Sequence, residues 1–74
     1  MIIFTNHSLL KLKQRRIPKE FVIETIEDPD HIQTSYSDRK AKYKKFGRLN
    51  LKVVYKNEGN DIVIITQHWV IKIK

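Results

Sequence analysis

The 74-residue chain is long enough for one domain with a small core and too short to enclose a large cofactor. Fifteen Lys and Arg against eight Asp and Glu give a net charge of +7, which favours a polyanionic partner; the alternative is that the charge serves only solubility. The absence of cysteine excludes disulfides and thiolate metal sites. Because neither a signal peptide nor a membrane-length apolar run is present, we expect a cytoplasmic protein without membrane contact.

A short strand and two helices are predicted at the start of the chain. Residues 2–4 are apolar, and Thr5 or Asn6 is suited to cap the helix that follows. The expected apolar face of this helix consists of Leu9, Leu10 and Leu12. The helix ends before Pro18, which starts a second helix, and Pro29 closes the second one.

A period of two in the remaining sequence predicts four strands, over residues 32–36, 40–46, 49–56 and 62–68. Gly47 and Arg48 are expected to form a tight hairpin, and the tail 70–74 is compatible with a lysine-guarded edge strand. The order is therefore β-α-α-β-β-β-β. We expect one α+β domain over residues 1–74, with a helical hairpin packed on a curved, mostly antiparallel sheet.

Familiar nucleotide, acyl-transfer and zinc motifs are absent, so neither a cofactor nor a metal is expected. Histidine, lysine and arginine remain, and these side chains supply the base, the acid and the cations that metal-free RNA cleavage requires. The first candidate group is His7, Lys11 and Arg15, spaced four apart on one side of the first helix. The alternative is an ordinary solvated polar face.

A second candidate pair, Thr66 and His68, lies where the most apolar strand becomes polar. It is a site only if the sheet brings His68 towards His7 or the basic hairpin; the alternative is a half-exposed strand end. His31 is expected to face solvent in a connecting segment. Trp69 is expected to pack in the core or at an edge.

The third candidate group is a basic hairpin with interleaved aromatic residues, which suits contact with phosphates and stacking of bases. Its residues are Arg39, Lys40, Lys42, Tyr43, Lys44, Lys45, Phe46 and Arg48. If the even-numbered lysines share a face, they form a stripe along one strand. The alternative is a solvent-facing strand whose charges prevent aggregation.

Three segments carry a family resemblance. Residues 7–18 (HSLLKLKQRRIP) resemble the H-A-x-x-R-M-x-x-R-x-I start of a family of small prokaryotic domains of uncharacterised function. Residues 21–29 resemble its second helix, and residues 62–66 resemble its apolar strand ending in threonine. That family is similar to the RelE/ParE/BrnT toxins of toxin-antitoxin modules.

The resemblance implies a RelE-like fold and an endoribonuclease-type toxin partnered by an antitoxin. The family's histidine falls on His7, its two arginines on Lys11 and Arg15, and its threonine on Thr66. Lys11 departs from the pattern, since a lysine does not clamp a phosphate in bidentate fashion.

We therefore expect a metal-independent endoribonuclease acting on RNA, free or on the ribosome. His7 and His68 would be base and acid in an order left open, with Lys11 and Arg15 on the scissile phosphate and the hairpin on the RNA backbone. One alternative is a non-catalytic nucleic-acid binding module, and another is a protein-interaction domain that pairs with an acidic antitoxin. A monomer or a small homo-oligomer is compatible with each hypothesis.

Overall fold

The computed structural model describes residues 1–34 and 38–71. Its elements are β1 (Ile2–Phe4), α1 (Asn6–Arg15), α2 (Lys19–Glu27), β2 (His31–Thr34), β3 (Arg39–Phe46), β4 (Leu49–Glu58) and β5 (Asp61–Val70). The predicted α+β class and the predicted element order are confirmed. The expected extension of the second strand to Tyr36, and residues 72–74 of the expected tail strand, lie outside the described residues.

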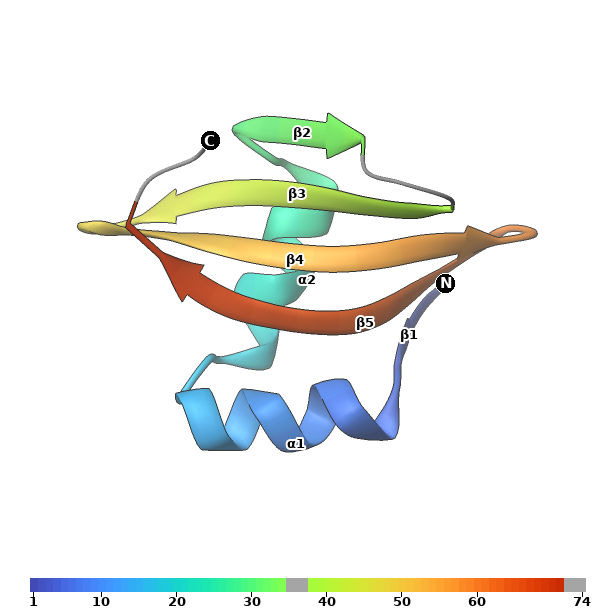
Figure 1. Ribbon diagram of the computed structural model, residues 1–74, viewed down its shortest axis with the longest axis horizontal. Helices are drawn as coiled ribbons and strands as arrows, with labels where there is room; N and C mark the ends of the chain where they lie inside the picture. Colours follow the sequence, from blue (N-terminus) through green and yellow to red (C-terminus); the bar gives the residue numbers. More distant parts are fainter. Residues whose placement is uncertain (35–37, 72–74) are drawn as a thin grey trace.

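All five strands form one mixed sheet in the order β1-β5-β4-β3-β2. Only the β1–β5 pair is parallel; the three other pairs are antiparallel. Figure 1 shows α2 crossing behind the sheet and α1 running beside β5. The opposite side of the sheet, which we call the open face, has neither α1 nor α2 on it. Within the described ranges, neither helix is long and apolar enough to cross a bilayer.

Local chemistry sets the two ends of α1. The Thr5 Oγ1 atom accepts a hydrogen bond of 3.1 Å from the Ser8 N–H, so Thr5 is the N-cap, one of the two residues predicted for that position. At the other end Arg16 adopts a left-handed conformation with φ of 54°. This residue turns the chain so that Ile17 is buried and Pro18 precedes α2.

The core lies between the two helices and the covered face of the sheet. Its buried members are Leu12, Ile17, Val22, Ile26, Leu51, Val53, Tyr55 and Ile64. Burial of each aliphatic side chain contributes roughly 1.5–3 kcal/mol relative to exposure. Trp69 packs edge-on against the stacked rings of Phe21 and Phe46, whose centroids lie 4.2 Å apart. The expectation that Trp69 is a packing residue is confirmed.

The predicted apolar face of α1 is wrong in two of its three members. Leu12 is buried, whereas Leu9 is 43% exposed and Leu10 53% exposed. The side of α1 that meets the sheet is centred on Ser8 and Leu12, which are one turn apart. Ser8 has a short side chain, and its hydroxyl donates to the Thr5 carbonyl, so the helix approaches β5 through a small polar residue.

Candidate functional site on the open face of the sheet

Three contacts hold α1 along β5. At its start, the Thr5 hydroxyl donates to the Ile64 carbonyl over 3.0 Å. In the middle, the buried Gln67 amide donates to the Ser8 carbonyl over 2.8 Å. At the end, the Arg15 guanidinium donates to the Gln67 carbonyl over 2.7 Å, with the Thr66 hydroxyl 3.4 Å away. These contacts fix Arg15 at the strand residues that precede His68.

The strand pairing places a row of polar and aromatic residues across the open face. Tyr43 of β3 pairs with His31 of β2 on one side and with Lys52 of β4 on the other, and Lys52 pairs with His68 of β5. Directly paired residues of an antiparallel sheet project to the same side. We call His31, Tyr43, Lys52 and His68 the transverse row, because it runs at right angles to the strands.

Side-chain contacts connect three of the four members of the transverse row. The His31 and Tyr43 rings have centroids 5.5 Å apart, and the Lys52 ammonium lies 5.8 Å from the centroid of the Tyr43 ring. The Tyr43 hydroxyl donates to the Gln33 side-chain oxygen over 2.8 Å. Tyr43 is only 4% exposed, so its ring supports its neighbours and offers no free surface for stacking a base.

His68 is held in an electropositive environment. Partial burial, the Lys52 ammonium and the Arg15 guanidinium all lower the pKa of His68 below its ordinary value of 6.5, and burial has the largest effect. Both cations disfavour a third positive charge. His68 is therefore a neutral proton acceptor beside two cations, and we call Arg15, Lys52 and His68 the basic centre.

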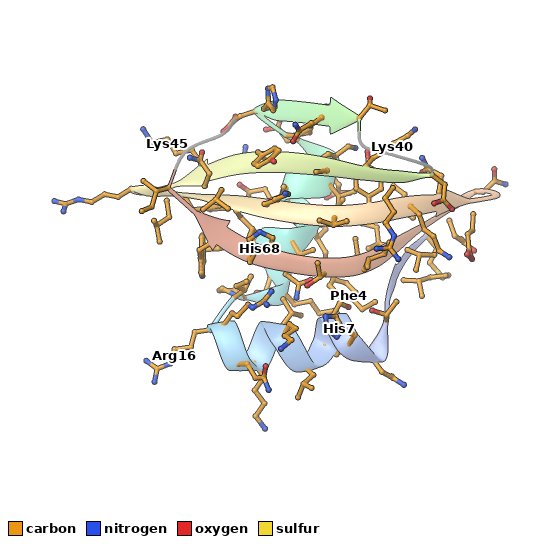
Figure 2. The ribbon with its side chains drawn as sticks, viewed as in Figure 1. Phe4, His7, Arg16, Lys40, Lys45 and His68 are labelled. Carbon is orange, nitrogen blue, oxygen red and sulfur yellow. The ribbon has the colours of Figure 1, made fainter. Side chains whose placement is uncertain are left out.

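The predicted helix group divides between two places. Arg15 belongs to the basic centre, whereas the Lys11 ammonium donates to the Gln14 side chain over 3.0 Å. His7 lies eight residues before Arg15, which is roughly 12 Å along a helix axis. In Figure 2, His7 is on α1, while His68 lies towards the end of the molecule that Arg16 and Lys45 occupy.

The predicted lysine stripe is continuous, but it lies on the helix-covered face. Lys42 pairs with Val53 and Lys44 pairs with Leu51, so both lysines share a side with the core. The Lys42 ammonium donates to the Ile26 carbonyl, and the Lys44 ammonium donates to the Asp28 carbonyl, each over 2.9 Å. These two lysines satisfy carbonyls at the C-terminal end of α2, where a helix attracts cations.

The remaining hairpin residues are spread along β3. Arg39 begins the strand and Arg48 follows its end, which places them about 24 Å or more apart along an extended chain. Lys40 and Lys45 lie near opposite ends of this strand (Figure 2). Phe46 stacks on Phe21 and is a packing residue. The structure therefore brings Thr66 and His68 together with Arg15, but it does not gather the hairpin cations into one patch.

Sequence reasoning missed Lys52 as a site residue. Its signal was its place on the polar side of the fourth strand, but only the register of β4 on β5 shows that it faces His68. His31 is exposed, as expected, yet it begins β2 and belongs to the transverse row. Within residues 1–34 and 38–71, no three His, Asp or Glu residues are grouped to hold a metal ion.

Residues 4–67 match the family described as Domain of unknown function (DUF4258). The chain belongs to that family, since the match covers most of its length. No curated protein and no solved structure matches the chain.

Proposed function

We propose that this domain binds RNA and cleaves it without a metal ion at the basic centre. The observation that carries the proposal is the convergence of Arg15 and Lys52 on His68, a histidine whose pKa is lowered. Phosphate is the common group that two such cations attract, and a neutral imidazole is a suitable base. The net charge of +7 supports a polyanionic substrate.

In the proposed reaction, His68 accepts the proton of the ribose 2′-hydroxyl while the 2′-oxygen attacks the adjacent phosphorus. The phosphorus–5′-oxygen bond breaks, and Lys52 donates a proton to the leaving 5′-oxygen. Arg15 and Lys52 stabilise the extra negative charge on the phosphorane-like transition state. The products are a 2′,3′-cyclic phosphate and a free 5′-hydroxyl, and proton exchange with water restores both side chains.

The proposal is tested with total cellular RNA in EDTA, with and without ribosomes. We expect His68→Gln to lower the cleavage rate by about 100-fold or more, the usual effect of removing a general base. His7→Ala is the matched histidine control and should retain activity, because His7 lies two helical turns from Arg15. Unchanged cleavage by His68→Gln would overturn this assignment, and loss only in His7→Ala would move the reaction to the start of α1.

We further infer a toxin-like role with an acidic antitoxin as partner. The sequence likeness to RelE/ParE/BrnT toxins and the basic surface both support this inference. The ribosome arm of the experiment tests whether the RNA is cut only in that context. Co-purification with the product of a neighbouring gene tests for the acidic partner.

A non-catalytic RNA-binding module is the second candidate function. It is favoured by the presence of only one histidine in the basic centre, since a lysine is a weaker acid than a histidine. This candidate predicts salt-sensitive RNA binding with no strand scission in any lane of the same experiment.

A further inference from the structure

We propose that a single strand of RNA crosses the open face at right angles to the β-strands, from Arg15 beside β5 along the transverse row to His31. This inference rests on the proposed RNA-binding function. It adds the path and the strandedness of the substrate. The juxtaposition that carries it is a line of cationic and protonatable side chains beside a second line whose centre is apolar.

The first line contains the groups that would contact phosphates. Arg15 lies beside the β5 end of the transverse row, and Lys52 on β4 and His31 on β2 belong to the row, so N–H donors are offered at three places along the path. The row extends over three strand spacings, or about 14 Å. That length suits a segment of a few nucleotides lying across the sheet.

A second line lies two residues further along each strand. It consists of Gln33, Ala41, Val54 and Thr66, which are paired in register across the same four strands. Of its two apolar members, Ala41 is buried and Val54 is half-buried, so Val54 provides the accessible apolar surface of this line. The open face therefore has a cationic margin next to a line that is apolar at Val54 and polar at its two ends, and we call this line the apolar strip.

A single strand of RNA has the matching chemistry, because phosphates line one of its sides and unpaired bases the other. In a duplex the bases are turned inward and only phosphates and the groove edges are available. The apolar strip would then have nothing to contact. Cleavage through a 2′-hydroxyl at the basic centre also requires a flexible strand that can align the attacking oxygen.

Contacts around the transverse row hold its side chains in place. Tyr43 supports the part of the row on β2 and β4, since it contacts His31, Gln33 and Lys52 and is itself buried. Asp30, the acidic residue next to His31, accepts a hydrogen bond from the Lys45 backbone N–H over 2.8 Å. Its carboxylate is therefore engaged at the margin of the row.

The test measures the binding of a fluorescent 12-nucleotide RNA whose 2′-hydroxyls are methylated, so that cleavage cannot interfere. Lys52→Ala and His31→Ala remove groups of the row, and Val54→Glu places a negative charge in the apolar strip. Lys13→Ala is the matched control, because Lys13 is exposed on α1. Circular dichroism checks that each variant is folded.

We expect Lys52→Ala to weaken binding about fivefold or more, and to reduce the slope of log K against log salt by about 0.7, the value for one phosphate contact on a single strand. His31→Ala should have a smaller effect of the same kind. Val54→Glu should abolish most binding. An unlabelled duplex of the same length should compete less well than the single strand.

Three results would overturn the inference in different ways. If RNA binds but Lys52→Ala and Val54→Glu behave like Lys13→Ala, the path does not cross this face, although the proposed function stands. If the duplex competes equally well, the substrate is not single-stranded. If the wild type binds no RNA at all, the proposed function itself is wrong and this inference falls with it.

Discussion

His68 shows how strongly one side chain depends on its neighbours. It comes from β5, and the two cations that disfavour its protonation come from β4 and from the end of α1. An isolated histidine at this point of the sequence would titrate near its ordinary pKa. Its chemistry in the folded protein is therefore a property of three elements and not of one residue.

This dependence predicts how stability changes with pH. Because the pKa of His68 is lower in the folded state than in the unfolded state, the unfolded state binds more protons as pH falls below about 6.5. The contribution is fully present above that pH and is lost as pH falls through the folded pKa. We expect His68→Gln to lose less stability than the wild type between about pH 7.5 and pH 5.5. Urea unfolding at both pH values measures the loss of unfolding free energy for each protein, and equal losses would contradict the lowered pKa of His68.

At the scale of elements, much of the fold follows from the sequence. The strand and helix order, the Thr5 cap and the packing of Trp69 are all confirmed. These features depend on local periodicity and on capping chemistry, which neighbouring residues determine. The β4–β5 register does not follow from the turn at residues 57–60 alone, because a β-bulge between Val54 and Tyr55 shifts it by one residue, so the pairing of Lys52 with His68 could not be predicted in the same way.

The two misplaced faces have different causes. Leu9 and Leu10 lie on the same side of the helix as Leu12, as a buried stripe requires. However, α1 packs along β5 and is held there by polar contacts at Thr5, Ser8 and Arg15, so Leu9 and Leu10 remain exposed. The face of β3 on which the lysines lie could have been predicted from the sequence. A two-residue turn at Gly47 pairs Phe46 with Leu49, which puts Lys44 opposite Leu51 on the core side.

The lysines that contact α2 predict a stability effect. Lys42→Met keeps most of the aliphatic stem but removes the partly buried hydrogen bond from the Lys42 ammonium to the Ile26 carbonyl. We expect a loss of about 1–2 kcal/mol in the free energy of unfolding. Lys45→Met is the matched control, because the Lys45 side chain is exposed on the other face of the same strand. Urea denaturation measures the free energy of unfolding of both variants. Equal losses would show that the Lys42 ammonium does not stabilise the C-terminal end of α2.

At the scale of the whole molecule, the excess of basic residues affects folding as well as binding. The chain has fifteen cationic and eight anionic side chains. The excess positive charges repel one another more in the folded state than in the extended chain, because folding brings them closer together. Ion pairs relieve part of this repulsion, including Lys44 with Asp28 at 3.3 Å and Lys56 with Glu58 at 2.8 Å. Most of the charge remains available to the solvent and to a polyanion.

The net charge predicts a stabilising effect of simple salt. Raising sodium chloride from about 0.02 to about 0.5 M shortens the screening length to a few ångströms and weakens the repulsion. We expect the urea midpoint to rise over this range. A falling midpoint would show that the ion pairs outweigh the repulsion. Urea is the suitable denaturant, because guanidinium chloride would itself add salt.

The pairing of β1 with β5 joins the beginning of the described chain to its end, with Ile2 opposite Ile62. During synthesis, Arg15 leaves the ribosome 53 residues before His68, which takes on the order of 3–10 s at usual elongation rates. Until then α1 has no strand to dock on, and the basic centre does not exist. A chain that acts on RNA at the basic centre would therefore be inactive during its own synthesis, while it lies next to the ribosomal RNA and the message from which it is made.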